Sequence, residues 1–339
     1  MQVCLHYPKI RFYDVFEGAR LRKTLKGACE YLNIPWEDSV GEKTDIAHFL
    51  SPKDEKELYS CKEKGIKTVV SCFYSENDPV ASFLIEKKGK KVIPAKTVRM
   101  MNSADLVLVP TEQFALMARD NGVTAPLKIL PAGVNLDRFA RDSLEAEIFP
   151  RYFQVRPNQK FALALGSYED QTTLEMLQSI AKKTPQFLFY FFGSPRKGDR
   201  AYLNLNRLKK KAPENLRFER LVEDDVYRSA LLHCSAFLLL DHDHPDQMGA
   251  LDAFAAKAEI VAVGDMSVNP FLHDQANCLI VPDAESASTA LARLYQGPDE
   301  AIIMAGYKAA ESRALPIFAK QLGEIYEELL SKNQGENHD

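Results

Sequence analysis

Short apolar runs alternate with longer segments of helical periodicity along nearly the whole 339-residue chain. Strands that alternate with helices favour parallel sheets joined by right-handed crossovers, so this one feature points to an α/β fold. In the first part of the chain, the pattern predicts strands at residues 3–7, 45–50, 68–73, 106–110 and 128–130. It predicts helices at 19–32 and 112–121, with Gly122 placed to end the second helix.

A polar segment at residues 141–159, which carries Pro150 and Pro157, interrupts the alternation and is interpreted as a link to a second unit. Beyond it, the pattern predicts strands at 161–165, 187–192, 216–219, 236–240, 260–263 and 278–281, and helices at 172–183, 201–211, 224–232, 248–256, 285–294, 299–313 and 315–330. We therefore expect an N-terminal domain at 1–145, a C-terminal domain at 155–313, and a last helix at 314–332 that packs back towards the N-terminal domain. Two doubly wound sheets normally bind ligand in the cleft between them, outside the carboxyl ends of their strands.

Composition narrows the functional classes. A formal net charge of −4 argues against general binding to nucleic acid. The sequence has no run of roughly 18 apolar residues that would span a bilayer, and its first residues lack the pattern of a signal peptide. We therefore expect a cytoplasmic protein. The 6 cysteines form no C-x-x-C pair, which favours isolated buried thiols over disulfides or a zinc site.

Three stretches carry a resemblance to a known family. Residues 104–112 (ADLVLVPTE), 121–123 (NGV) and 130–139 (LPAGVNLDRF) resemble, in order and spacing, the run that ends the N-terminal domain of retaining GT-B glycosyltransferases of the glycogen-synthase-like superfamily, family 4 or group 1. Residues 45–49 (DIAHF) are similar to an earlier strand of these enzymes, and 306–313 (GYKAAESR) to their C-terminal segment. The short length and compact first domain are similar to bacterial diacylglycerol glucosyltransferases.

The resemblance covers nearly the whole chain and implies both a fold and a reaction. The fold would be GT-B, with two Rossmann-like doubly wound domains that face each other across a cleft. The reaction would transfer a hexosyl group from a nucleotide-diphosphate sugar, such as UDP-glucose, to a lipid or polysaccharide acceptor. The nucleotide sugar is a co-substrate, so no cofactor is implied. No metal is implied either, because Arg and Lys side chains would stabilise the charge that develops on the departing diphosphate.

The donor-phosphate loop of these enzymes, written G-R-x-x-x-x-K-G, is altered in this chain. It aligns with the stretch that begins at Gly166, where Ser167 takes the position of the Arg and Thr172 that of the Lys. The loop carries Glu169 and Asp170 instead. Two like charges 4 Å apart repel by about 4 kcal/mol under partial burial, so these acids would oppose a bound diphosphate. Thr172 is predicted to cap the helix that follows.

The sugar and ribose motif of these enzymes, two glutamates 8 positions apart, is also altered. His244 takes the first position and Asp252 the second. Met248 and Gly249 open a predicted helix whose backbone N–H groups could receive an anion, and Asp252 could accept hydrogen bonds from ribose hydroxyls. The surrounding stretch is rich in metal-ligating residue types, but their spacing matches no standard ligand set, and we expect a polar surface loop. Those residues are Asp241, His242, Asp243, His244 and Asp246.

The N-terminal domain differs from the pattern in a similar way. Ser71 stands where glycolipid-type relatives begin a His-x-His loop. Ser75 and Asp78 remain in that loop as polar groups or as turn residues. Gly18 lies at a predicted helix start that suits close approach to the donor, and Arg20 could replace a lost cation. A solvated basic helix face is the alternative for that helix.

Residues 83–99 hold 6 cations and 1 acid, interleaved with apolar side chains. Such a segment suits docking on an anionic membrane surface, at about 1 kcal/mol per basic residue near the lipid. A solvated loop and helix face is the alternative. Gly89 and Pro94 argue against one long amphipathic helix. The cations proposed to contact membrane or acceptor are Lys87, Lys88, Lys90 and Lys91.

Two hypotheses follow. The chain is an active hexosyltransferase with a rearranged donor site, peripheral on the inner face of a membrane, or it is an inactive pseudo-glycosyltransferase that acts as a partner or regulatory subunit. Catalytic residues are not assigned, because the positions that would carry them are altered. Those positions are Ser71, Ser167, Thr172 and His244.

Overall fold

A computed structural model describes residues 1–7, 17–52, 54–73, 85–87, 90–140, 147–168, 170–194, 198–220, 222–240, 247–266 and 269–331. The chain divides into two compact units. Unit 1 is built mainly from Glu17–Asn135, together with the first strand and the segment that begins at Arg313. Unit 2 is built mainly from Leu136–Ser312.

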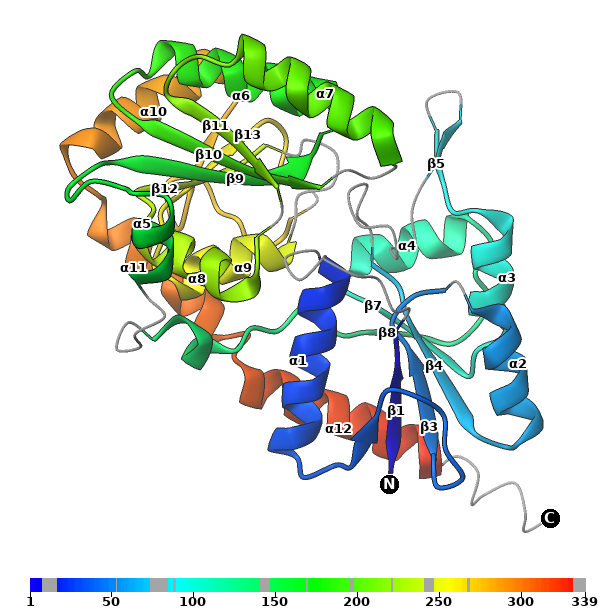
Figure 1. Cartoon of the computed structure of the whole chain (residues 1–339). Coiled ribbons are helices and arrows are strands. Elements are labelled where there is room, and N and C mark those ends of the chain that lie inside the picture. The colour runs from blue at the N-terminus through cyan, green and yellow to red at the C-terminus, as the bar shows by residue number, and fades with distance from the viewer. Residues whose placement is uncertain are drawn as a thin grey trace. The chain divides into compact units, whose positions relative to one another are not determined.

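Unit 1 is a sheet of 6 parallel strands in the order β2-β1-β3-β4-β7-β8. Helices α2, α3 and α4 cover one face, and α1 and α12 cover the other (Figure 1). The strands are β1 (Val3–His6), β2 (Trp36–Glu37), β3 (Ile46–Phe49), β4 (Lys67–Ser71), β7 (Leu106–Val109) and β8 (Leu127–Ile129). The helices are α1 (Glu17–Tyr31), α2 (Glu55–Glu63), α3 (Ala95–Ser103), α4 (Glu112–Asp120) and α12 (Leu315–Ser331).

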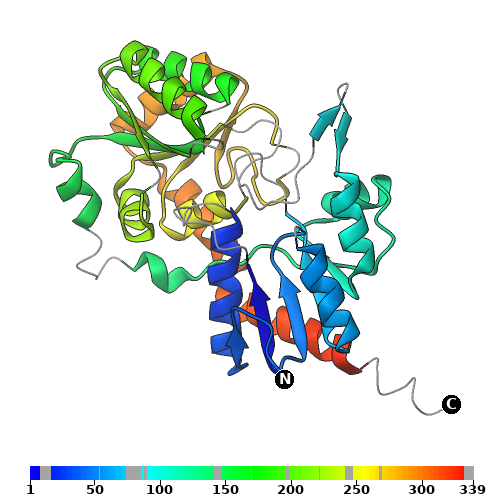
Figure 2. The same ribbon diagram turned by 45° about the vertical axis from the view of Figure 1, so that its right-hand side comes forward.

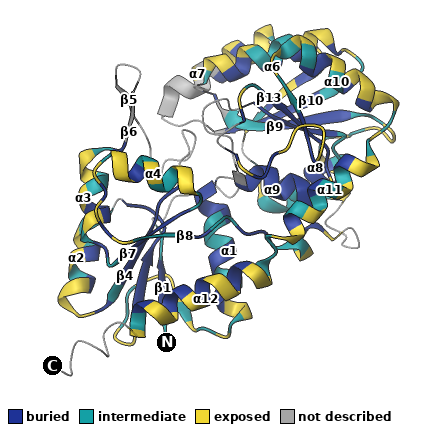
Figure 3. Ribbon diagram, turned by 180° about the vertical axis from the view of Figure 1, so that it is seen from behind, coloured by how far each residue is buried: buried dark blue, intermediate teal, exposed yellow. Residues whose placement is uncertain are grey.

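The two faces of this sheet follow from the alternation of side chains along each strand. In β3, Ile46 packs in the cluster under α1 and α12, whereas Ala47 and Phe49 pack in the cluster under α2–α4. Because both faces are covered, the inner strands are largely apolar, as expected for a parallel sheet. The inner strands of this sheet are mostly buried, whereas its edge strands β2 and β8 are partly exposed (Figure 3).

An antiparallel hairpin formed by β5 (Ile85–Lys87) and β6 (Lys90–Val92) precedes α3 (Figure 2). The basic segment is therefore not one long helix, as Gly89 and Pro94 indicated. The backbone of Pro94 holds the N-cap position of α3, where its missing N–H removes no hydrogen bond.

Unit 2 is a second sheet of 6 parallel strands in the order β11-β10-β9-β12-β13-β14. Helices α6, α7 and α10 lie on one face and α8, α9 and α11 on the other (Figure 1). The strands are β9 (Phe161–Ser167), β10 (Leu188–Ser194), β11 (Leu216–Arg220), β12 (Ala236–Leu239), β13 (Ile260–Val263) and β14 (Leu279–Val281). The helices are η1 (Leu136–Phe139, 3-10), α5 (Ile148–Tyr152), α6 (Gln171–Lys183), α7 (Gly198–Lys211), α8 (Asp224–His233), α9 (Gln247–Ala255), α10 (Ala284–Gln296) and α11 (Glu300–Glu311).

Both sheets have doubly wound topologies, which confirms the predicted α/β class with two Rossmann-like sheets. In unit 2 the third, second, first, fourth, fifth and sixth strands lie side by side, which is the order of the Rossmann fold. In unit 1 the leading strand β1 lies between β2 and β3, as in flavodoxin-like sheets.

The interpretation of residues 141–159 as a link is wrong in part. α5 lies inside this segment and packs against α8 in unit 2. Phe149 is fully buried, and its ring centroid lies 5.0 Å from that of Phe161 and 5.0 Å from that of Tyr190. Its backbone N–H also donates to Ser229 Oγ at 2.9 Å. The two prolines and the polar flanking residues are typical of a linker, although Phe149 belongs to the core.

Candidate functional site

Each sheet reverses its winding direction between two neighbouring strands, and ligands of open α/β sheets bind outside the carboxyl ends of the strands at such a point. In unit 2 this point lies between β9 and β12, and in unit 1 between β1 and β3. The candidate sites are therefore the loops that follow these strands and the helices that begin there. Gly166 and Ser167 end β9, and α9 with Met248 and Gly249 follows β12.

The loop after β9 is anchored by aromatic packing. Tyr168 is buried, and its hydroxyl donates a hydrogen bond to the backbone carbonyl of Glu219. Gly193 leaves room for this ring, because a Cβ there would lie 2.8 Å from the Tyr168 ring. A Cβ at Gly166 would lie 2.9 Å from the ring of Phe191, so this glycine serves close packing inside the sheet. Burial raises the pKa of the Tyr168 phenol, which keeps it a neutral donor.

Asp170, and not Thr172, caps helix α6. The Asp170 carboxylate accepts from the backbone N–H of Thr173 at 3.1 Å and from the Thr173 hydroxyl at 2.6 Å. The prediction for Thr172 is wrong because the Asp170 side chain, two residues earlier, already holds the cap position, and Thr172 is exposed on the first turn. The Thr173 hydroxyl also lies 3.4 Å from the carbonyl of Leu240, which joins the loop after β9 to the end of β12.

Asp252 lies on α9 and is buried, with 3% of its surface exposed. The Tyr227 hydroxyl donates to its Oδ2 at 3.2 Å. Its Oδ1 lies 3.8 Å from Nη1 of Arg138, which belongs to η1. Asp252, which aligns with the ribose carboxylate of the family pattern, thus lies beside a hydroxyl and a guanidinium.

Arg138 connects this carboxylate to a second one. Its Nη2 lies 2.6 Å from Oδ1 of Asp224, in the first turn of α8. Arg228 faces the same Asp224, with Nε 3.4 Å from Oδ2, and it donates to the backbone carbonyl of Arg138 at 3.1 Å. Two arginines and two aspartates therefore form one half-buried cluster on η1, α8 and α9.

The residues expected at the unit 1 site lie on α1. Gly18 is buried in the first turn, as predicted for a helix start. Arg20 is also buried, with 1% of its surface exposed, so a solvated face does not describe this side chain. Arg22 lies 2.5 Å from the carboxylate of Asp38, and Lys26 lies over the ring of Trp36. The basic residues of α1 are therefore integrated into unit 1.

Ser71 ends β4 and is buried. Its hydroxyl lies 2.7 Å from Nε2 of His48, and Nδ1 of His48 lies 2.6 Å from the hydroxyl of Tyr326 on α12. Burial lowers the pKa of His48 to about 3, so the imidazole is neutral. The histidine that the family pattern places in this region therefore has no counterpart at Ser71 itself, but a histidine from the neighbouring strand holds the Ser71 hydroxyl.

Several predicted residues fall outside what the structure describes. They are His244 with the surrounding 241–246 stretch, Glu169, Lys88, Ser75 and Asp78. For Ser167, Lys87, Lys90 and Lys91 the backbone is described but the side chain is not.

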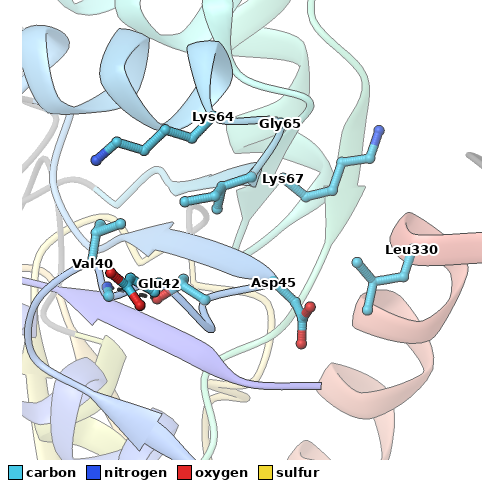
Figure 4. A pocket seen from close by; sticks show the side chains of 10 residues that line it. Val40, Glu42, Asp45, Lys64, Gly65, Lys67 and Leu330 are labelled. Atoms are coloured by element: carbon cyan, nitrogen blue, oxygen red, sulfur yellow. Dashed lines mark hydrogen bonds between the residues drawn. The ribbon is translucent and has the colours of Figure 1, made fainter.

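A cavity of about 550 Å³ opens at the other end of the unit 1 sheet (Figure 4). Asp45 directly precedes β3 and Lys67 begins β4, so the cavity lies at the amino ends of these strands. Ser71 marks the opposite, carboxyl edge. Lys64 and Glu42 also line the cavity, as does Leu330 of α12. Its place at the amino edge separates it from the candidate sites.

No helix among the described residues has the length and apolar character needed to cross a membrane.

The chain thus holds two Rossmann-like units, each with polar groups at the carboxyl edge of its sheet. No family model matches the chain. The chain is 21% identical over 228 residues to a processive diacylglycerol alpha-glucosyltransferase of Acholeplasma laidlawii, which covers 67% of this chain and 68% of the relative. Together with the fold, this match supports a resemblance to the GT-B glycosyltransferase superfamily.

Solved structures show the same fold. A glycosyltransferase from Rickettsia africae matches with a TM-score of 0.70 and 14% identity over 97% of this chain and 98% of its own. Sucrose-phosphate synthase from Thermosynechococcus elongatus matches with a TM-score of 0.67 and 14% identity over 92% and 78%. Anabaena HepE, crystallised with UDP and glucose, matches with a TM-score of 0.66 and 13% identity over 91% and 89%.

Sequence reasoning missed the cluster around Asp252. Arg138 lies within the stretch 130–139, which was used as a marker of the fold and not of the site. Tyr227, Asp224 and Arg228 come from a helix that was predicted without any functional residue. Arg138 and Asp252 lie far apart along the chain, so no local sequence pattern shows that they pair. A carboxylate inside an apolar helix does indicate that it needs a partner.

Proposed function

We propose that the chain is a hexosyltransferase that uses a nucleotide-diphosphate sugar, UDP-glucose-like, and a lipid or polysaccharide acceptor. The observation that carries this proposal is the match to a diacylglycerol glucosyltransferase over two thirds of both chains. The Rossmann order of unit 2 supports it, since such sheets bind nucleotides at the point where Asp252 and the start of α9 lie. A structural relative that was crystallised with UDP-glucose supports the choice of donor.

The donor would rest on unit 2. The first turn of α9, with Met248 and Gly249, offers backbone N–H groups to the diphosphate, and Asp252 offers acceptor oxygens to the ribose. Gly166 and Ser167 end β9, and Thr172 lies in the first turn of α6, on the other side of the switch point. The lost cations of the loop after β9 would have to be replaced from elsewhere for catalysis.

Calorimetry with UDP and UDP-glucose tests this function. We expect saturable binding by the native protein and weaker binding by Asp252→Ala. Asp120→Ala is the matched control, because this exposed carboxylate ends α4 at the amino edge of the unit 1 sheet. Release of UDP from UDP-glucose in the presence of diacylglycerol vesicles then tests transfer. The absence of any binding at millimolar nucleotide would contradict the proposed function.

The pseudo-glycosyltransferase is the second candidate, and one observation favours it. The loop after β9 has no Arg or Lys at its two cationic positions, and its acid Asp170 is committed to capping α6. Binding of nucleotide without UDP release, with any acceptor offered, would select this candidate. UDP release that disappears in Asp252→Ala would select the enzyme.

Membrane docking of the hairpin is the finer part of the proposal, with the protein cytoplasmic and peripheral. Lys87 lies opposite Lys90 in the register of β5 and β6, so the hairpin gathers basic residues on two adjacent strands. At about 1 kcal/mol per lysine, exchange of Lys87, Lys90 and Lys91 for Gln should weaken binding to phosphatidylglycerol vesicles about a hundredfold.

Vesicle flotation measures this effect. The control exchanges Lys209, Lys210 and Lys211 for Gln, because these lysines end α7 and are exposed. The two variants have the same net charge. Equal flotation of both variants would contradict docking through the hairpin.

A further inference from the structure

We propose that Arg138 is a positioning residue of the donor site, which fixes the Asp252 carboxylate for recognition of the nucleotide ribose. This inference rests on the proposed function, because it concerns the same site in unit 2. Neither the family pattern nor any donor motif assigns a role to Arg138. The assignment comes from the geometry of the cluster on η1, α8 and α9.

The first step concerns the orientation of Asp252. Its carboxylate has one oxygen bonded to the Tyr227 hydroxyl at 3.2 Å and the other facing Arg138 Nη1 at 3.8 Å. Two different groups therefore fix the two oxygens, and the plane of the carboxylate is set by both. A carboxylate has about four lone-pair directions, so it can accept several hydrogen bonds at once.

The second step concerns the charge beside Asp252. The side chain has 4% of its surface exposed, and burying a carboxylate is costly unless it is paired. Arg138 places a guanidinium beside it. Hydrogen bonds that involve a charged group are stronger than those between neutral groups. The guanidinium thus acts on the nucleotide through Asp252.

The third step concerns what holds Arg138. Its closest carboxylate contact is the 2.6 Å pair with Asp224, while the contact to Asp252 at 3.8 Å exceeds a hydrogen-bond distance. Asp224 therefore anchors the guanidinium in place, and the attraction to Asp252 is electrostatic. Arg228 braces the same anchor through Asp224 and the backbone carbonyl of Arg138. Asp224 and Arg228 together keep the Arg138 guanidinium at a fixed position beside Asp252.

Ribose recognition gives a readout that a purely structural arginine would not affect. The affinity for UDP is compared with that for 2′-deoxyuridine diphosphate, which lacks one ribose hydroxyl. We expect the native protein to prefer UDP and Asp252→Asn to lose the preference. Arg138→Gln should weaken UDP binding about tenfold and reduce the preference towards that of Asp252→Asn, because removing one member of a contacting pair removes their coupling.

Arg293→Gln is the control. Arg293 also belongs to unit 2 and pairs with an aspartate, Asp299, at 2.6 Å, but it shares no residue with the cluster on η1, α8 and α9. We expect this variant to keep the native preference for UDP. In the double variant Arg138→Gln with Asp252→Asn, the loss of preference should not exceed that of Asp252→Asn alone.

Arg138→Lys keeps the test decisive if Arg138→Gln fails to fold. Lys keeps the charge without the planar fork, so we expect a preference between those of the native protein and Asp252→Asn. A folded Arg138 variant with the native preference would overturn the inference and leave the proposed function intact. If the native protein binds neither nucleotide at millimolar concentration, the proposed function fails and the inference fails with it.

Discussion

At the scale of single residues, one position of the family pattern, Ser71, takes part in a buried hydrogen-bonded network. Ser71 stands where a histidine was expected, and its hydroxyl is held by His48. His48 is itself fixed by Tyr326 on α12. A chain of three side chains thus joins the carboxyl edge of the unit 1 sheet to the C-terminal helix. A neutral imidazole at its centre makes this chain sensitive to acid.

We predict that His48 contributes to the acid sensitivity of folding. Its pKa is about 3 in the folded protein because of burial, below the ordinary value of about 6.5. As pH falls below about 6.5, the unfolded chain takes up a proton that the folded chain refuses, so stability is lost at up to about 1.4 kcal/mol per pH unit until pH approaches 3. Above pH 7 the residue contributes no pH dependence.

Urea unfolding at pH 7, 6, 5 and 4.5 measures this slope. His48→Gln should show a shallower fall in the free energy of unfolding below pH 6.5 than the native protein does. His273→Gln, at an exposed histidine, serves as the control and should follow the native curve. Parallel curves for the native protein and His48→Gln would contradict the prediction.

At the scale of elements, the sequence predicted most strands and helices to within a few residues, because their apolar side chains follow the periods of strand and helix. Helices α2 and α3 were not predicted. Each buries only two residues, Leu58 and Cys61 in α2 and Met100 and Met101 in α3, so the apolar stripe is too weak to detect. The N-cap of α6 was assigned to the wrong residue, because Asp170 was weighed as a charge facing a ligand and not as a cap.

We predict that the capping residue of α6 is Asp170. Asp170→Ala removes acceptors for the Thr173 backbone N–H and hydroxyl, and should cost about 0.5–2 kcal/mol of stability. Thr172→Ala, two residues on, alters an exposed side chain and should cost less than about 0.5 kcal/mol. Thermal midpoints of the two variants give the comparison. A larger loss for Thr172→Ala would restore the original assignment.

A second prediction concerns the packing of the stretch 130–139 against α12. A Cβ at Gly133 would lie 2.6 Å from Cγ of Phe318, which is buried in the core of unit 1. Gly133→Ala should therefore destabilise the protein by about 1–3 kcal/mol through overpacking. Gly297→Ala is the control, because a Cβ there meets no atom within 4 Å. Equal thermal midpoints for both variants would show that Phe318 yields without cost.

At the scale of the whole molecule, the architecture could be predicted from the sequence and the site only in part. Alternating strands and helices are repeated along the chain, and each repetition supports the same fold class. The contact between Arg138 and Asp252 depends on one pair of side chains brought together by η1 and α9, and no pattern in the sequence repeats it. Local periodicity therefore carries the fold, whereas the site depends on tertiary placement.

The proposed function assigns the nucleotide to unit 2, which leads to a prediction about where UDP binds. If UDP binds unit 2, backbone amides at the start of α9 and around Gly166 should exchange more slowly with solvent deuterium when UDP is present. At a UDP concentration 100 times the Kd, amides that open only by global unfolding should gain about 2.7 kcal/mol of protection. Amides around the cavity at Lys64 and Asp45 should not gain protection through direct contact.

Hydrogen exchange with mass spectrometry, with and without UDP, measures both regions in one experiment. The single tryptophan, Trp36, lies in β2 of unit 1 and gives an independent optical probe of that unit. We expect UDP to leave its emission unchanged while α9 is protected. Protection confined to the cavity of unit 1 would place the nucleotide at the amino edge of that sheet. Unit 2 would then have the strand order of a Rossmann fold without binding the nucleotide.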